Sequence, residues 1–188
     1  MEENKKENIW NIPNFFTALR VVIALLLIYL IFAGYGIISI IVFFVAGMIT
    51  DALDGQIARR LKMTTEFGRK FDMIADRVLM LGTTLPFVIK FVASGLFTNY
   101  HLVQIILILS REIITSPFAV WGMFTKRAFP QIRLSGKVTT VLQAIAFPAI
   151  ALSVFYSQFN FSLYLAILTS IAGAITAFYY IRDIIKGK

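Results

Sequence analysis

The sequence predicts an all-α fold, an integral membrane bundle of six transmembrane helices with both termini in the cytoplasm. Of its 188 residues, 59% are hydrophobic, which is too many for a soluble domain. They form six apolar stretches of about 20 residues or more, long enough to span a hydrocarbon core of about 30 Å. Basic residues gather in alternate connections. Such a chain has no room for two sizeable domains, so we expect a single membrane-embedded domain over residues 1–188, with residues 1–11 as a cytoplasmic N-terminal segment.

The first three expected spans cover residues 12–33, 36–58 and 67–93. Pro13 lies near the first turn of the first span, and Asn11 is a candidate N-cap. The second span ends in a run of acidic and basic residues, and the third begins with another. These charged ends place polar chemistry close to one face of the membrane.

The other three expected spans cover residues 100–124, 138–156 and 159–181. The fourth contains Arg111 and Glu112, about 18 Å from its outer start by helix rise. The fifth opens directly after Gly136 and Lys137, and the sixth leads into a basic tail. An even number of spans puts both termini on one side.

Charge then indicates which side is the cytoplasm. The clustered basic residues are Lys5, Lys6, Arg59, Arg60, Lys62, Arg69, Lys70, Lys126, Arg127, Arg133, Lys137, Arg182, Lys186 and Lys188. The connections at 34–36 and 157–160 carry no charge. By the positive-inside rule, the crowded side is cytoplasmic. The net charge of +8 therefore predicts membrane lipid headgroups and phosphates as partners, and no nucleic acid.

Two other classes of feature are not expected. The chain has no cysteine, which excludes disulfides and thiolate metal sites. Its first ten residues mix acidic and basic side chains, and the apolar stretch that follows is long enough to stay in the membrane. We therefore expect no removable signal peptide.

Four aspartates lie inside segments that are otherwise apolar enough to cross a bilayer. They are Asp51, Asp54, Asp72 and Asp76. An aspartate at a helix centre costs about 2.5–3.5 kcal/mol, so four facing lipid would cost on the order of 10 kcal/mol. Helical spacing puts Asp51 and Asp54 on one face, and it puts Asp72 and Asp76 on another. We expect the four to face one another, a cation or water.

Two such faces can converge into a cage of carboxylate oxygens. Hard oxygen ligands without His or Cys favour Mg²⁺, Mn²⁺ or Ca²⁺ over zinc or copper. The alternative is a set of buried acids that are protonated or neutralised by Arg59, Arg69 and Arg77. Salt bridges require neither Gly55 nor Ala58 nor this regular register, so a metal site is the preferred hypothesis.

The spacing resembles the signature of the CDP-alcohol phosphotransferase family. That signature is D-x-x-D-G-x-x-A-R, eight residues, then G-x-x-x-D-x-x-x-D. Its fixed positions are filled here by Asp51, Asp54, Gly55, Ala58, Arg59, Gly68, Asp72 and Asp76. The match covers residues 51–76, and the hydropathy of the whole chain agrees with the family's six-helix membrane core. A common bacterial pattern has Pro after the third aspartate and Lys after the fourth, where this chain has Met73 and Arg77.

The resemblance implies a CDP-alcohol phosphatidyltransferase with two Mg²⁺ or Mn²⁺ ions per site. Asp51, Asp54 and Asp72 would hold one ion. The second would be held by Asp51, Asp72 and Asp76. Asp76 would also be the catalytic general base toward the acceptor hydroxyl. Shared carboxylates and two ions suit phosphoryl transfer, which needs mainly positioning and charge compensation.

The same motif would bind the nucleotide of CDP-diacylglycerol. Gly55 and Ala58 would let the cytidine or diphosphate approach the backbone, and Arg59 would bind a phosphate in a fork. Gly68 completes the motif. Close helix packing of small residues is an alternative role for Gly55 and Ala58.

The start of the first span resembles the Pro-Asn…Thr…Arg pattern of many family members. Asn14, Thr17 and Arg20 recur at three-residue steps. They could line the cytoplasmic mouth of the site. Simple capping and snorkelling at the interface would explain them nearly as well. We include Asn14 and Thr17 among the expected nucleotide-binding residues.

Arg111 and Lys137 are the expected acceptor-binding residues. An arginine inside a membrane span is by default a functional hypothesis, although it could simply pair with Glu112 or an aspartate. Family members with phosphorylated acceptors resemble this chain in having an Arg-Glu pair in the fourth helix and a Gly-Lys step opening the fifth. Several cations suit an acceptor that carries phosphate, whereas choline would favour carboxylates or an aromatic cage.

The predicted function is phospholipid biosynthesis in the cell membrane. The enzyme would transfer a phosphatidyl group from CDP-diacylglycerol to sn-glycerol 3-phosphate, releasing CMP and forming phosphatidylglycerophosphate at a site facing the cytoplasm. Alternative acceptors are phosphatidylglycerol, giving cardiolipin, and inositol phosphate. A cation or proton transporter using the aspartates is an alternative of another class. The family resemblance also implies a homodimer.

Overall fold

The computed structural model describes the fold over residues 12–61, 65–124, 134–156, 158 and 160–186, and the side chains of these residues apart from 51–61, 66, 69, 122–124, 134 and 186. The described residues contain helices and no strand, which confirms the all-α prediction. The helices are α1 (Ile12–Ala33), α2 (Ile37–Leu61), α3 (Glu66–Ala93), α4 (Asn99–Ile108), α5 (Ser110–Phe124), α6 (Leu134–Ser153) and α7 (Ser162–Lys186).

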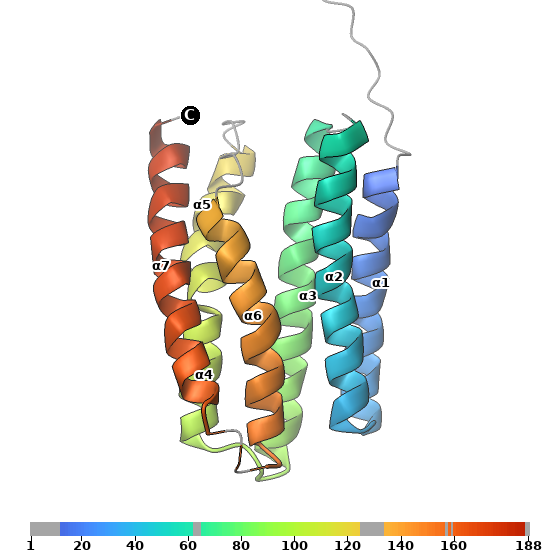
Figure 1. Ribbon diagram of the computed structural model, residues 1–188, viewed down its shortest axis with the longest axis vertical. Coiled ribbons are helices and arrows are strands. Elements are labelled where there is room, and N and C mark those ends of the chain that lie inside the picture. The colour runs from blue at the N-terminus through green and yellow to red at the C-terminus, as the bar shows by residue number, and fades with distance from the viewer. Residues whose placement is uncertain (1–11, 62–64, 125–133, 157, 159, 187–188) are drawn as a thin grey trace, which may run out of the picture. The chain divides into compact units, whose positions relative to one another are not determined.

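The chain divides into two compact units, Met1–Lys90 and Phe91–Lys188. In the first, α1, α2 and α3 lie side by side (Figure 1). In the second, α7 packs against α4, α5 and α6. The prediction of one domain over 1–188 is not tested by this division and stays a prediction.

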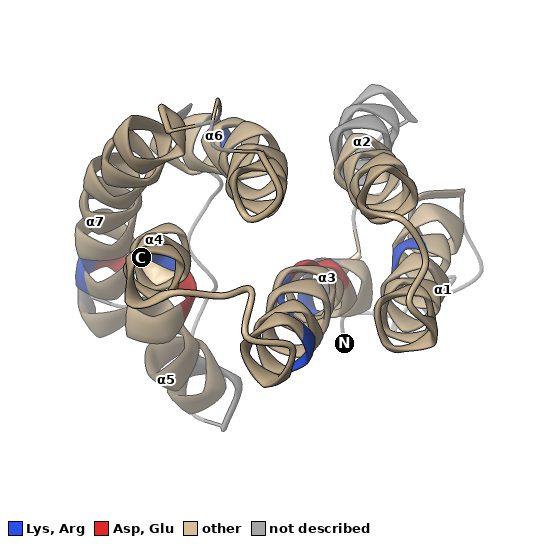
Figure 2. Cartoon of the chain, turned by 90° about the horizontal axis from the view of Figure 1, so that it is seen from below, with Lys and Arg blue, Asp and Glu red and all other residues tan. Residues whose placement is uncertain are grey.

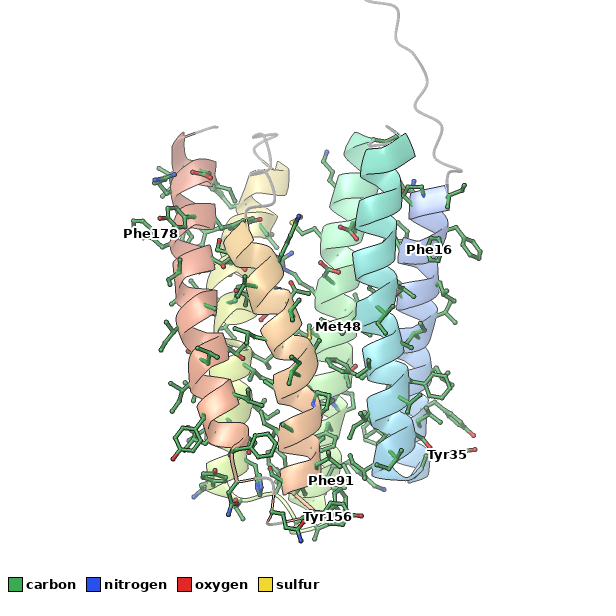
Figure 3. The ribbon with its side chains drawn as sticks, viewed as in Figure 1. Phe16, Tyr35, Met48, Phe91, Tyr156 and Phe178 are labelled. Atoms are coloured by element: carbon green, nitrogen blue, oxygen red, sulfur yellow. The ribbon has the colours of Figure 1, made fainter. Side chains whose placement is uncertain are left out.

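In the first unit, α1 runs antiparallel to α2. Tyr35 lies where α1 turns into α2, and Phe16 lies toward the other end of α1 (Figure 3). Gly34 ends α1 at φ +80°, and the N–H of Tyr35 donates to the Leu30 carbonyl at 3.0 Å. Glycine adopts this left-handed conformation at a helix end without strain. The turn returns the chain toward the end of the unit that carries the aspartate motif.

Small residues let the helices of the first unit approach closely. A Cβ atom added to Gly47 on α2 would lie 2.9 Å from Leu79 Cδ1 on α3 and 3.3 Å from Ile23 Cγ2 on α1. The buried apolar side chains around this point include Ala24, Leu27 and Phe44. Close packing of this kind is the main attraction between helices in lipid, where the hydrophobic effect gives no preference.

Polar pairs join the helices of the second unit. Ser162 donates to Gln104 Oε1 at 2.9 Å and so links α7 to α4. The hydroxyls of Thr139 and Thr176 lie 3.1 Å apart between α6 and α7. In contrast, Phe178 on α7 is exposed and projects outward (Figure 3), as expected for a side chain in lipid. The two polar pairs therefore lie between helices of the second unit.

Three described helices are long and apolar enough to cross a membrane, namely Ile12–Ala33, Ser135–Ser153 and Ser162–Ile185. A fourth span is possible if α4 and α5 cross together. By helix rise, α2 and α3 are about 37 and 42 Å long, which is sufficient for a crossing, but α3 carries many charges. The count of six spans and the side of the termini remain predictions.

The expected fourth span, residues 100–124, is formed by two helices, α4 and α5, and whether they cross the membrane together stays a prediction. The chain breaks at Leu109 (φ −87°, ψ −1°), and α4 and α5 meet at a 45° bend. The Leu109 N–H still donates to the Ile105 carbonyl, so the backbone remains satisfied through the bend. The break comes directly before Ser110, Arg111 and Glu112, whose polar side chains bond to α6 and α7. Apolar content alone gave no sign of this bend.

Candidate functional site

Two aspartates of the motif share one arginine. Asp72 and Asp76 lie one turn apart on α3, and Arg20 on α1 reaches both. Its Nη1 atom donates to Asp72 Oδ1 at 2.8 Å and to Asp76 Oδ1 at 2.7 Å. The Arg20 side chain is 0% exposed, whereas Asp72 and Asp76 are 32% and 38% exposed. Figure 2 shows the acidic residues of α3 in red and the basic residue of α1 in blue.

A second contact joins the start of α1 to the start of α3. Asn14 is buried, and its Oδ1 atom would lie 2.7 Å from a Cβ atom added to Gly68. The Gly68 N–H donates to Thr65 Oγ1 at 2.9 Å, which caps α3. Gly68 therefore has a steric role, because any side chain would displace both Asn14 and the capping hydroxyl. The structure brings together two predicted nucleotide-binding residues from different parts of the sequence.

Thr17 lies one turn from Asn14 on α1 and is also buried. Its hydroxyl donates to the Pro13 carbonyl at 3.1 Å, a bond within the same helix. This local bond fits the simpler interpretation of Thr17 as a helix residue. A role in nucleotide binding stays a prediction.

The α2 half of the motif lies outside the described side chains. Its residues are Asp51, Asp54, Gly55, Ala58 and Arg59. The backbone of α2 is helical as far as Leu61, so the three-residue step from Asp51 to Asp54 does follow a helix. Among the side chains that are described, no group of three acidic or histidine residues forms a metal site. The four-aspartate cage stays a prediction.

Arg111 anchors a separate polar network in the second unit. It contacts Glu112 Oε1 through Nε at 2.8 Å and Nη2 at 2.6 Å. Its Nη1 donates to Thr140 Oγ1 on α6 at 3.2 Å. Glu112 Oε2 in turn accepts from Gln143 Nε2 at 2.8 Å. Glu112 is 4% exposed and Arg111 is 18% exposed, so the carboxylate is the more deeply buried partner.

Lys137 is an exposed residue near the start of α6. The carbonyl of Gly136, its neighbour, lies 3.5 Å from Arg111 Nη1. The structure thus places the Arg111 guanidinium beside the residue that precedes Lys137. It also confirms that Arg111 pairs with Glu112, the alternative that the sequence left open.

Sequence reasoning missed several residues that position the site. Arg20 was noticed only as part of a three-residue repeat, and its partners lie 52 and 56 residues away. The cap from Thr65 had a visible signal, since Thr before Glu66 is typical of a helix start. Nothing in the sequence indicated a contact between Gln143 and Glu112, apart from the polar side chain of Gln143 in an apolar span.

A family model for CDP-alcohol phosphatidyltransferase matches residues 10–178. The chain is 31% identical over 170 residues to the CDP-diacylglycerol–glycerol-3-phosphate 3-phosphatidyltransferase of Rickettsia typhi, covering 89% of each chain. It is 32% identical over 141 residues to the Haemophilus influenzae protein of the same name, covering 73% of each chain. For the Salmonella typhimurium protein of that name, the identity is 34% over 146 residues, or 73% of this chain and 74% of the other. The chain therefore belongs to the CDP-alcohol phosphatidyltransferase family.

Proposed function

We propose that this protein transfers a phosphatidyl group from CDP-diacylglycerol to sn-glycerol 3-phosphate, releasing CMP and forming phosphatidylglycerophosphate. The observation that carries the proposal is the similarity to relatives named for that reaction, which extends over 89% of both chains in the Rickettsia typhi comparison. Membrane helices and a polar aspartate site on α3 suit a lipid substrate with a charged head. The enzyme would lie in the cell membrane with its site facing the cytoplasm, and would act as a homodimer.

The α3 aspartates fit a divalent metal site. They lie on adjacent turns of one helix, and both accept from Arg20 Nη1. About a third of each side chain remains exposed. Asp51 and Asp54 would complete the ligand set, and carboxylate oxygens suit Mg²⁺ or Mn²⁺. When bound, the two ions would neutralise the diphosphate and stabilise the leaving CMP.

The chain's own residues would then bind and orient the substrates. Gly68 and Asn14 would shape the nucleotide pocket at the paired ends of α1 and α3, together with Gly55, Ala58 and Arg59 of α2. Asp76 would accept the proton of the attacking hydroxyl. Arg111 and Lys137 would bind the phosphate of the acceptor, with Glu112 fixing the fork of the Arg111 guanidinium.

A competition assay tests the reaction and its acceptor. Purified protein would receive CDP-diacylglycerol and Mn²⁺ with equal concentrations of glycerol 3-phosphate, phosphatidylglycerol and inositol phosphate, and the lipid products would be separated by mass. We expect CMP release with phosphatidylglycerophosphate as the main product. Cardiolipin without phosphatidylglycerophosphate would show that the acceptor is wrong, and ion flux without CMP release would contradict the enzyme activity.

The homodimer needs a separate measurement. Chemical cross-linking in native membranes should give a species of twice the monomer mass. Cross-linked samples that contain only monomers would remove the dimer from the proposal.

A further inference from the structure

One nitrogen of Arg20 contacts two aspartates, whereas a simple ion pair needs only one carboxylate. A single nitrogen, Nη1, donates to Asp72 Oδ1 and to Asp76 Oδ1 at 2.8 and 2.7 Å. An Nη atom carries two hydrogens, so each carboxylate can accept one of them. Because both Oδ1 atoms contact the same nitrogen, the distance between them cannot exceed the sum of these two distances. One buried cation therefore draws two like charges on α3 toward one point.

The three side chains differ in how much of their surface is exposed. Arg20 is fully buried, whereas each aspartate keeps about a third of its surface exposed. The exposed part of the two carboxylates must lie on the side that Arg20 does not cover. A cation that came from outside the protein would therefore reach these carboxylates over the surface that Arg20 leaves uncovered.

We propose that Arg20 is a positioning residue that acts as the resident counter-ion of Asp72 and Asp76, holding the two carboxylates together in the metal-free protein and competing with a divalent metal for their charge. This inference rests on the proposed function, because it takes both aspartates as metal ligands. A cation on the carboxylates would lie within a few ångströms of the guanidinium, and the two like charges would repel each other. The arginine therefore stabilises the empty site and weakens metal binding.

A purely structural salt bridge would behave differently. If Arg20 served only to fix α1 against α3, its loss would lower stability equally with and without metal. A resident counter-ion matters most when no metal is present, since a bound metal takes over the neutralisation. The dependence on metal therefore separates the two roles.

The test compares thermal unfolding in EDTA and in saturating Mn²⁺, together with Mn²⁺ affinity from the electron paramagnetic resonance signal of the free ion. Arg20→Gln should lower the melting temperature more in EDTA than in Mn²⁺. It should also bind Mn²⁺ more tightly, by on the order of tenfold, because one nearby positive charge is gone. Arg20→Lys keeps the charge and should bind Mn²⁺ with nearly the wild-type affinity.

Leu27→Ala is the matched control, since Leu27 is a fully buried residue two turns further along α1. Its melting temperature should fall by the same amount in EDTA and in Mn²⁺, and its Mn²⁺ affinity should stay unchanged. This variant reports the effect of loosening α1 without altering charge.

Each other outcome has a defined meaning. Equal losses of stability in both conditions for Arg20→Gln, or unchanged or weaker Mn²⁺ binding, would overturn the counter-ion role. If Arg20→Gln does not fold, adding Asp72→Asn should restore folding in EDTA, and failure to do so would overturn it as well. Wild-type protein that binds no Mn²⁺ would instead overturn the metal site of the proposed function, and the competition with it.

Discussion

At the scale of single residues, Gly68 of the motif has a steric role that can be measured. Gly68→Ala would put a methyl group 2.7 Å from Asn14 Oδ1 and 2.9 Å from Thr65 Oγ1. We expect lower stability by about 1–2 kcal/mol from the disturbed cap, and weaker CDP-diacylglycerol binding because Asn14 is displaced.

Gly82→Ala on the same helix is the control. Its added methyl would meet atoms only at 3.8 Å and beyond, so it should be neutral or stabilising by about 0.5–1 kcal/mol. Equal effects of the two variants, in thermal unfolding and in binding assays, would contradict this role.

The aspartates of α3 give a second prediction at this scale. Asp72→Asn should abolish CMP release, because Asp72 is the proposed shared ligand of both ions. Asp76→Asn should slow the chemical step more than it weakens nucleotide binding, since its main proposed role is that of a base. CMP release and equilibrium binding of CDP-diacylglycerol would separate the two effects. Asp183→Asn, in an Arg182 pair on α7, is the matched control and should keep most of the activity. Near-normal turnover of Asp72→Asn would be fatal to the two-metal hypothesis.

Residue identities and spacing alone identify the aspartates and glycines of the motif, whose roles stay predictions. Helical register alone predicts that Asp72 and Asp76 share a face, and the structure agrees. The contact between Asn14 and Gly68 was not predictable, because it depends on how α1 packs against α3. The same holds for Arg20, whose partners are distant in the sequence.

At the scale of helices, the bend between α4 and α5 carries the Arg111 network. Glu112→Gln would remove the negative charge that holds the Arg111 guanidinium. It would also remove the carboxylate oxygen that accepts from Gln143. We expect a rise of about tenfold in KM for glycerol 3-phosphate, with a smaller change for CDP-diacylglycerol, and a loss of about 1–3 kcal/mol in stability. Steady-state kinetics with each substrate varied in turn would measure this.

Two comparisons sharpen that experiment. Ser110→Ala alters the same bend but leaves the Arg111–Glu112 pair intact, so KM should not change. Arg111→Ala and Lys137→Ala should each weaken acceptor use more than CDP-diacylglycerol binding. Equal losses for both substrates would mean that these cations support the helices rather than the acceptor.

Helix ends were predictable where glycine or a polar run marks them. The expected first span, residues 12–33, coincides with α1, and the expected third, 67–93, differs from α3 by one residue. The bend at Leu109 was not predictable, because the side chains that follow it bond to residues of α6 and α7 that are distant in the sequence. Periodicity reports which segments are helical, but it does not report where tertiary contacts bend them.

At the scale of the whole molecule, the membrane orientation can be tested directly. The chain has no cysteine, so a single introduced thiol reports its own side of the membrane. Tyr35→Cys, in the uncharged turn after α1, should react with a membrane-impermeant reagent in intact cells, whereas Glu3→Cys should react only after permeabilisation. Tyr35 is exposed, so the thiol will be accessible. The opposite pattern of labelling would reverse the predicted orientation.

The buried pairing of Arg20 also constrains how the chain is made. Ribosomes deliver α1 to the membrane first, yet Asp72 is synthesised 52 residues later and Asp76 later still. During that interval α1 carries a cation without its final partners, at a cost of up to about 2.5–3.5 kcal/mol if it lies deep in the bilayer. Arg20 is about 12 Å from the start of α1, close enough for its long side chain to reach the headgroups while it waits. Arg20 should therefore stay at the headgroups in nascent chains that stall before α3, and it should become buried only when α3 and its aspartates arrive.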